Sequence, residues 1–309
     1  MAVTGQREQV IAVLDRSRSS DHVLRWAARE ATSRRVPLRL IQTFTVPTMP
    51  LAARLGDATT LLTWPQICQD THDRTAALLS RSRRSVAAIH PDLPVSVAAE
   101  CGSVASVSAE RSAEALLTVI AARRTYSFPD SLFGSVPARI IGRAPGPIVS
   151  IPPPRSFSGP VEPSVVVSLD GWPGFGAALG FAFQAAAVRH HLLWAVHTWD
   201  DAATEGLFGR RLTPHDREVI DREKHRTMDE ELSAWRVQFP HVDVRTLVLR
   251  GRPAPTLLNF CRRRHQGSEP ALVVVVSRGL PGRRASRPHT IIRSLVAHAP
   301  CPIAVVPAS

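Results

Sequence analysis

This sequence of 309 residues lacks several features that define large classes of protein. It has no uninterrupted run of about 18 apolar residues, which excludes a transmembrane helix. Its first residues do not follow the basic, apolar and small-residue order of a signal peptide, so we expect a cytoplasmic protein with no membrane partner. Hydrophobic residues make up 44% and charged residues 21%, which excludes a largely disordered chain and indicates a folded one.

Cysteine is scarce as well, and the four cysteines form no CxxC pair. Cys261 and His265 are four residues apart and would share a helix face, but two ligands do not make a zinc site. We therefore expect no metal centre and interpret the cysteines as buried, reduced thiols. They are Cys68, Cys101, Cys261 and Cys301.

Lysine is almost absent, since Lys224 is the only one, yet Lys and Arg together number 38 against 26 Asp and Glu. The resulting net charge of +12 comes from short clusters of arginine, such as residues 262–264, and not from one long tract. A solvated positive surface accounts for such clusters, and so does an acidic protein partner or nucleic acid. The absence of a recognised nucleic-acid-binding motif argues against nucleic acid.

Two common nucleotide-binding motifs are missing, namely the P-loop GxxxxGK[ST] and a GxGxxG after a first strand. No nucleophile, base and orienting acid stand at a recognisable spacing, so we expect no catalytic residues and no enzyme.

The most informative feature that is present is an internal repeat. VIAVLD at residues 10–15 answers VVVSLD at 165–170, so Asp15 and Asp170 are 155 residues apart. The offset falls to 149 between Gly102 and Gly251 and then returns to 155 for the proline-flanked ends of both copies. Residues 1–152 and 163–309 are therefore predicted to be two copies of one domain. Residues 153–162 are rich in proline and are predicted to be a short, stiff linker.

Within each copy, continuous apolar runs of strand length alternate with helical patterns. Such runs are typical of parallel strands buried on both faces. We predict two tandem α/β domains, each a doubly wound parallel sheet with strand order 3-2-1-4-5 and four helices. The helices include 20–34, with a serine cap, and 214–238, with proline in its first turn. The predicted strands are 9–14, 37–44, 94–99, 115–121 and 147–151, then 164–169, 191–199, 242–249, 271–276 and 301–306.

The ends of the strands are where ligands bind in such sheets. Asp15 and Asp170 each follow a first strand, where a carboxylate accepts hydrogen bonds from a ribose or a base. An alternative is that each Asp caps the next helix or braces a turn.

A second candidate region joins the fourth strand to the last helix. Ser277 and Gly279 lie in this turn of the second copy, followed by Thr290, and the first copy has Gly134 and Ser135. Ser135 and Thr290 are predicted to lie where a helix begins, so each either caps the helix or contacts phosphate.

These motifs resemble the universal stress protein family, and the whole chain is similar to its tandem two-domain members. The resemblance rests on the strand-end Asp, the glycine turns at Gly102 and Gly251, the Ser277–Gly279 turn and the proline-containing ends of both copies. It implies an adenine-nucleotide-binding fold, with adenine near the strand-end Asp and near Thr43 or Thr198. ATP is the ligand that this resemblance implies, with the role of Mg²⁺ left open.

Both copies depart from the family's phosphate-loop pattern of glycines. Ala121 and Arg124 replace the first two glycines in the first copy, while Val276 and His289 replace the first and third in the second. Each replacement adds a Cβ where phosphate approaches closely or where a positive φ is needed, and Val276 is expected to fit worst. If either copy holds nucleotide, the second is the better candidate.

We interpret the protein as a regulator of the stress response that acts by association and not by turnover. The two copies are predicted to form an intramolecular pseudo-dimer in which 147–151 lies beside 302–306, since pairing covers two exposed strand edges. Two alternatives stay open. One is a weak ATPase, which normally needs Mg²⁺, and the other is a basic scaffold that binds an acidic partner or nucleic acid without nucleotide.

Overall fold

The structure of the chain is a computed structural model, and it divides into two compact units, Met1–Ala121 and Ala122–Ser309. These units do not coincide with the two copies of the sequence repeat, since residues 122–152 of the first copy belong to the second unit. The structure describes residues 8–15, 19–45, 58–122, 144–153, 164–169, 175–264, 272–277 and 286–308, without the side chains of 58–64, 263–264 and 286–290.

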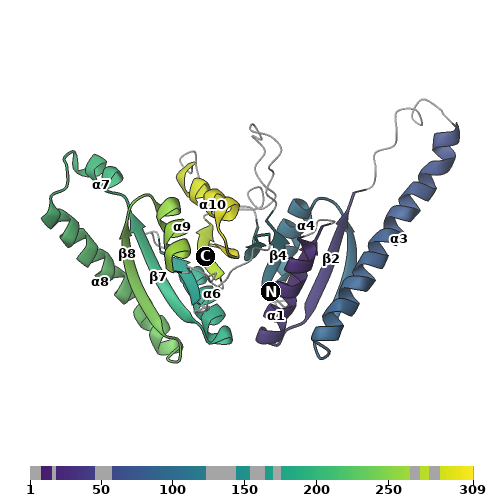
Figure 1. Ribbon diagram of the computed structural model, residues 1–309, viewed down its shortest axis with the longest axis horizontal. Coiled ribbons are helices and arrows are strands. Elements are labelled where there is room, and N and C mark those ends of the chain that lie inside the picture. Colours follow the sequence, from purple (N-terminus) through teal and green to yellow (C-terminus); the bar gives the residue numbers. More distant parts are fainter. Residues whose placement is uncertain are drawn as a thin grey trace, which may run out of the picture. The chain divides into compact units, whose positions relative to one another are not determined.

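The first unit is an α/β layer structure around a parallel sheet with the order β3-β2-β1-β4 (Figure 1). β1 and β4 are buried along their whole length. The continuous apolar sequence of β1 predicts this, whereas β4 also buries the polar Thr118. α1 packs on β1 and on α3, which lies along β2 and β3, while α4 lies against β1 and β4. The right-handed crossover rule places α4 on the face opposite α1 and α3. The elements are β1 (Val10–Leu14), α1 (Ser20–Arg34), β2 (Leu38–Phe44), α3 (Ala58–Ile89), β3 (Val95–Cys101), α4 (Val104–Arg111), the 3-10 helix η1 (Ser112–Glu114) and β4 (Leu117–Ala121).

The second unit contains the whole second copy and the last strand of the first. Its sheet has the order β5-β10-β9-β6-β7-β8, and every pairing is parallel except that between β5 and β10. Within the second copy, the strands follow the predicted order 3-2-1-4-5, which is confirmed. The elements are β5 (Ile148–Ile151), β6 (Ser164–Ser168), α6 (Gly176–Arg189), β7 (Leu192–Trp199), α7 (Asp201–Phe208), α8 (Pro214–Gln238), β8 (Val244–Arg250), α9 (Pro253–Arg264), β9 (Leu272–Ser277), α10 (Ser286–His298) and β10 (Ile303–Pro307).

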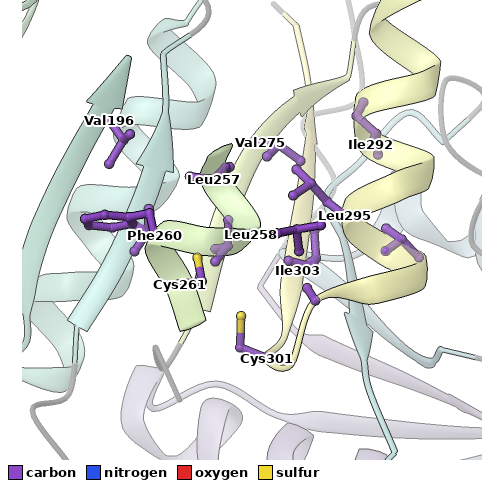
Figure 2. Close-up of a cluster of buried hydrophobic side chains, with 14 of the residues drawn as sticks. Val196, Leu257, Leu258, Phe260, Cys261, Val275, Ile292, Leu295, Cys301 and Ile303 are labelled. Carbon is purple, nitrogen blue, oxygen red and sulfur yellow. The ribbon is translucent and has the colours of Figure 1, made fainter. Parts of the chain in front are cut away.

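One large apolar cluster lies between the second unit's sheet and the helices α9 and α10. Figure 2 shows Phe260 of α9 directed towards β7, near Val196, and Leu295 of α10 directed towards the strands that carry Val275 and Ile303. Each of these side chains is buried. Burial of this kind is the main source of stability for such a layer and fixes where the strand ends lie.

The predicted side-by-side placement of 147–151 and 302–306 is also found. β5 pairs with β10 in antiparallel register, with Val149 opposite Ala304. This pairing covers the edge of β10, and it explains why the compact units divide at Ala121–Ala122 and not within the predicted linker. Nearly all of that linker lies outside the described residues.

The predicted helices 20–34 and 214–238 are confirmed as α1 and α8. The predicted serine cap of α1 is found, since Ser19 is the N-cap residue, although its side chain makes no capping hydrogen bond. The prediction of four helices was wrong for the second copy, whose described residues contain five because α7 forms between β7 and α8. None of the helices in the described part of the chain has the length and apolar character needed to cross a bilayer.

Burial of the cysteines is confirmed only for Cys261 and Cys301. Cys101 is exposed at the end of the edge strand β3, and Cys68 is half-buried on α3. Edge positions leave one side of a strand to solvent, which apolar character alone does not reveal. His265, the other residue weighed as a metal ligand, lies outside the described residues.

Candidate functional site

A matching glycine turn follows the third strand of each copy. Gly102 and Gly251 have φ values of +145° and +127°, a conformation that L side chains rarely adopt. Their N–H groups donate to the carbonyl oxygens of Phe44, at 2.8 Å, and Trp199, at 2.7 Å. Each turn therefore ties the carboxyl end of the third strand to that of the second, at the edge where a ligand is expected.

In the first copy, the candidate residues Asp15 and Thr43 lie at this edge, but both have partners. Ser20 donates to the Asp15 carboxylate at 3.0 Å and also to its backbone carbonyl oxygen. Thr43 donates to the Leu14 carbonyl oxygen at 3.4 Å, and Gln42 donates to the same oxygen at 3.1 Å. Asp15 thus braces the turn between β1 and α1, which is one of the roles that its position predicts.

In the second copy, the corresponding backbone oxygen belongs to Leu169, and His197 takes the place of Gln42. The Nδ1 of His197 is hydrogen-bonded to the Leu169 carbonyl oxygen, so this nitrogen carries the proton. Burial lowers the pKa of His197, against the opposing effect of that hydrogen bond, and the charge of Lys224 lowers it further. A neutral His197 therefore holds the end of β6 beside β7.

Thr198 is the residue that distinguishes the second site from the first. Its side chain is only 5% exposed, and its hydroxyl has no hydrogen-bond partner among the described residues. The equivalent hydroxyl of Thr43 is used by the protein itself. An unpaired buried hydroxyl costs about 1–3 kcal/mol, which a ligand that supplies the missing partner recovers.

The same comparison applies to the turn after the first strand. Ser20, which braces Asp15, corresponds to Phe175 in the second copy, and a phenylalanine has no hydroxyl to donate. Phe175 is buried at the N-cap of α6. The second copy therefore lacks the serine that engages the strand-end carboxylate in the first.

The other predicted site residues are placed only in part. Ser277 is buried at the end of β9, where its carbonyl oxygen accepts from the Ala308 N–H at 2.8 Å. Thr290 lies in α10 but in its second turn, so the prediction that the helix begins there was wrong. α10 begins at Ser286 because Pro288 fits the first turn of a helix, where its missing N–H needs no partner. Asp170, Gly279, Gly134 and Ser135 lie outside the described residues.

The structure also corrects the expectation that Val276 needs a positive φ. Val276 lies within β9 and pairs with Val306 of β10. Among the described residues, Arg35 and His190 are the non-glycine residues with positive φ, and Val276 is not one of them. Extended backbone suits a β-branched residue, so the replacement at this position causes no backbone strain.

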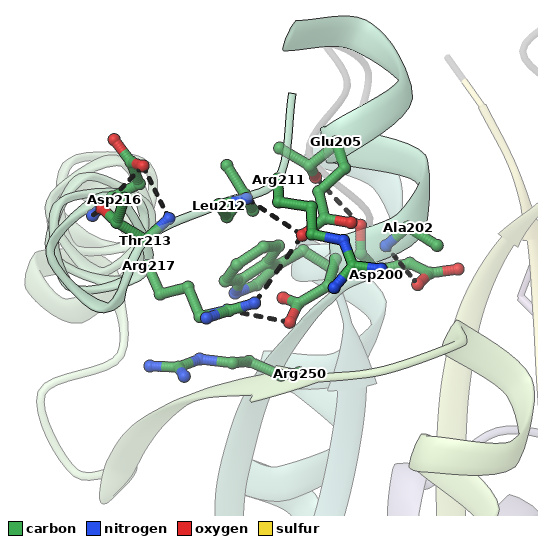
Figure 3. A network of polar contacts seen from close by, with 12 residues as sticks. Asp200, Ala202, Glu205, Arg211, Leu212, Thr213, Asp216, Arg217 and Arg250 are labelled. Carbon is green, nitrogen blue, oxygen red and sulfur yellow. Dashed lines mark hydrogen bonds and ion pairs between the residues drawn. The ribbon is translucent and has the colours of Figure 1, made fainter. Parts of the chain in front are cut away.

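A polar network next to the second site was missed in the sequence. α7 begins directly after β7, and Arg217 of α8 pairs with Asp201 of α7 at 3.0 Å (Figure 3). Glu205 accepts from the Leu212 N–H at 2.9 Å, and the carboxylate of Asp200 caps α7 through the Ala202 N–H at 3.1 Å. The network fixes α7 against α8 where the chain leaves β7. Asp200 before a short helix was the available signal, but eight residues gave no apolar period to support it.

Comparison with known proteins gives a consistent result for both copies. The profile of the Universal stress protein family matches residues 6–152 and 163–307. Universal stress protein Rv1996 of Mycobacterium tuberculosis is 26% identical over 306 residues, which cover 96% of this chain and 94% of that protein. Universal stress protein Rv2623 of the same organism is 28% identical over 276 residues, covering 88% and 87%.

The fold is shared with a solved structure as well. The crystal structure of a universal stress protein from Archaeoglobus fulgidus has a TM-score of 0.62 at 14% identity, with coverage of 98% of this chain and 97% of that one. At this identity the likeness concerns the fold alone. Because the family profile covers nearly the whole chain in two consecutive matches, the protein belongs to the universal stress protein family and is a tandem two-domain member of it.

Proposed function

We propose that this protein is a cytoplasmic regulator of the stress response that binds an adenine nucleotide and acts by association and not by turnover. Family membership supports a role in the stress response, and nucleotide binding is the part of the proposal that goes beyond it. The observation that carries this step is the buried hydroxyl of Thr198, which has no partner among the described residues at the carboxyl ends of the strands. A bound ribose or base supplies that partner, so nucleotide and site fit each other.

The second copy is the proposed binding site for ATP. Asp170 and Thr198 contact the ribose or base, while Ser277, Gly279 and Thr290 lie towards the phosphates. The corresponding set of the first copy, Asp15, Thr43, Gly134 and Ser135, binds more weakly, because Asp15 and Thr43 already have intramolecular partners. No residue is assigned to Mg²⁺, and titrations with and without the ion measure its contribution.

The domain arrangement is part of the same proposal. Residues 1–152 and 163–309 are the two domains, 153–162 is the linker, and the copies associate as an intramolecular pseudo-dimer. The antiparallel pairing of β5 with β10 supports this arrangement, because it joins the last strands of both copies. Such a chain offers a protein partner two related surfaces.

The test is calorimetric titration with ATP of the wild type and two matched pairs of variants. Thr198→Val removes one hydroxyl and should weaken binding by about 2- to 10-fold, whereas Thr43→Val should leave affinity unchanged. Asp170→Ala should weaken it by about tenfold or more, and Asp15→Ala should not. Thr198→Val also removes an unpaired buried hydroxyl, so its stability should not fall, which separates a binding defect from a folding defect.

Other outcomes favour the alternatives. Loss of binding in the Asp15 and Thr43 variants alone moves the site to the first copy. No heat with any variant, together with salt-sensitive capture of nucleic acid or an acidic protein, favours the basic scaffold. Steady release of phosphate from ATP favours the weak ATPase.

A further inference from the structure

A groove of about 530 Å³ lies between α1 and α3 in the first unit. Leu24, Ala28 and Val86 form an apolar floor and are each at most 6% exposed. Asp15 and Thr43 do not line it, so the groove is distinct from the candidate nucleotide site. Its volume falls in the range of about 300–1,000 Å³ that is typical of small-molecule sites.

The rim of this groove carries three arginines, namely Arg25, Arg29 and Arg81. All three are exposed, and none makes an ion pair with any residue that the structure describes. Within the described part of the chain, the hydrogen bond that the Arg25 side chain makes goes to the backbone carbonyl oxygen of Asp21, at 3.4 Å. Asp21 is the acidic side chain that lines the groove, so three positive charges face one negative charge.

His22, near the N-terminus of α1, is affected by the same excess of positive charge. Burial lowers the pKa of His22, and the charges of Arg25 and Arg29 lower it further. The other acid near this part of α1, Glu30, is buried and paired with Arg34 at 2.5 Å. The arginines at the rim are therefore available to bind an anion from outside the chain.

The second copy closes the equivalent space with aromatic side chains. With the repeat offsets of 155 and 149, Ala28 corresponds to Phe183 and Val86 to Trp235. The Phe183 and Trp235 rings are stacked with centroids 5.8 Å apart, and Phe239 lies 5.5 Å from Phe183. The groove is therefore a property of the first copy and not a consequence of the fold.

The charges at the rim are also absent from the second copy. Arg25, Arg29 and Arg81 correspond to Gly180, Gln184 and Glu230. The first copy therefore has smaller floor residues than the second, and its rim arginines have no ion-pair partner among the described residues. It is also the copy that has the groove. Because shape and charge differ together at these positions, the expected ligand has an apolar part and a negative charge.

We propose that the groove between α1 and α3 binds a small amphiphilic anion. Its apolar body lies on Leu24, Ala28 and Val86, and its phosphate or carboxylate head is held by Arg25, Arg29 and Arg81. Guanidinium groups bind both kinds of head through paired, charge-assisted hydrogen bonds. Burial of the apolar body supplies the remaining affinity and selects against a bare anion.

The first experiment tests the two parts of the ligand separately. Decyl phosphate, below its micellar concentration, is titrated into the full chain in a calorimeter, beside decanoate, decanol and inorganic phosphate. Binding of decyl phosphate or decanoate that exceeds binding of decanol and of phosphate by about tenfold supports the proposal. Equal binding of decanol, or of phosphate alone, overturns it.

The second experiment places the site on the protein. Arg25→Gln/Arg29→Gln/Arg81→Gln should weaken binding by about tenfold or more, and Ala28→Phe should weaken it by filling the floor. A matched control removes three exposed arginines of α3 that do not line the groove, Arg74→Gln/Arg83→Gln/Arg84→Gln, and should bind as the wild type does. Circular dichroism checks folding, and either groove variant alone is decisive if the other fails to fold.

Three outcomes contradict the proposal. Equal loss in the matched control assigns the effect to the overall positive charge and not to the groove. Undiminished binding in both groove variants excludes the groove. Sedimentation of the protein with vesicles of phosphatidic acid and phosphatidylcholine that requires Arg25 and Arg29, without binding of monomeric decyl phosphate, replaces the small ligand by a membrane surface.

Discussion

The two copies share one order of strands but differ in what fills the space between sheet and helices. In the second copy, Trp194 and Phe260 meet edge to face at 5.9 Å inside the apolar cluster of α9 and α10. The corresponding residues of the first copy are Arg39 and Arg111. Both arginines pair there with Glu100, at 3.5 and 3.1 Å.

The opposite face repeats this difference. Phe183, Trp235 and Phe239 fill the space under α8, whereas the equivalent space under α3 is a groove with an arginine rim. One backbone thus tolerates an aromatic core and a partly ionic one. At these positions the second copy packs aromatic rings, whereas the first has ion pairs and a groove.

The largest effect is expected when the residues of the two copies are exchanged at one position. Phe183→Ala should lower the free energy of unfolding by about 3–5 kcal/mol, because a fully buried ring is lost and a cavity remains. The reciprocal change, Ala28→Phe, should cost about 1 kcal/mol or less, because the groove receives the ring without displacing a packed side chain. Chemical denaturation measures both. Similar losses for the two changes would show that the groove is not free space.

A second difference concerns how the long helix is fixed to the sheet. In the second copy, Asp221 accepts from the buried Trp199 indole N–H at 2.8 Å and pairs with Arg250. The first copy has Phe44 and His72 at the positions of Trp199 and Asp221, and their rings meet edge to face at 6.4 Å.

Asp221→Ala should therefore cost about 1–3 kcal/mol, because it leaves the Trp199 N–H buried without a partner. Asp229→Ala, which removes an exposed pair with Arg236, should cost at most about 1 kcal/mol. Thermal and denaturant unfolding of both variants measure the difference. If Asp229→Ala proves as costly as Asp221→Ala, the hydrogen bond from Trp199 to Asp221 is not what holds α8 on the sheet.

Glycine provides a third and smaller test. A Cβ at Gly180 would lie 2.8 Å from the Trp235 ring, whereas a Cβ at Gly206 of α7 would meet nothing within 4 Å. Gly180→Ala should therefore destabilise by about 1 kcal/mol despite the better helix propensity of alanine. Gly206→Ala should stabilise by about 0.5–1 kcal/mol. A stabilising Gly180→Ala would mean that the aromatic stack is loosely packed.

The smallest expected effect is a dependence of stability on pH that arises from His191 of the second copy. Burial, with help from Arg189 and His190, lowers the pKa of His191 to about 4, and the corresponding residue of the first copy is Val36. Unfolded His191 takes up a proton near pH 6.5, so stability falls as the pH drops from 6.5 towards 4 and levels off below that. Solvent screening at this half-buried side chain keeps the effect small.

His191→Val installs the first copy's residue and should remove this part of the pH dependence. The exposed His215→Gln serves as the matched control and should keep the wild-type profile. Denaturant midpoints between pH 4 and 7 decide the matter. An unchanged profile in His191→Val would assign the pH dependence to other groups.

Much of the fold can be predicted from the sequence because buried parallel strands appear as runs of mostly apolar residues of strand length. VIAVL is apolar at every position and VVVSL at every position except Ser168, and both form strands within a residue or two of the predicted bounds. α8 was predictable for a local reason, since Pro214 opens its first turn after Thr213, whose side chain makes a capping box with Asp216.

The site was less predictable because its character depends on partners that are distant in sequence. Nothing local to Thr43 or Thr198 reveals that one hydroxyl reaches the Leu14 carbonyl oxygen while the other has no described partner. The groove is hidden in the same way, because Ala28 and Phe183 are both ordinary helix residues until α3 and α8 are placed beside them. Periodicity reports which face of a helix is buried, not how well that face is filled.

The pairing of β5 with β10 bears on the history of the gene as well as on the fold. A shorter gene that encoded the first copy alone would yield a chain whose last strand has lost its antiparallel partner. A gene for the second copy alone would leave the outer edge of β10 uncovered. Either product would depend on meeting another chain, at a rate set by its abundance. Fusing two copies into one reading frame replaces that dependence with a partner at a fixed, high effective concentration. It then allows each copy to accumulate changes, such as Ala28 in one and Phe183 in the other, that a symmetric dimer encoded once could never hold separately.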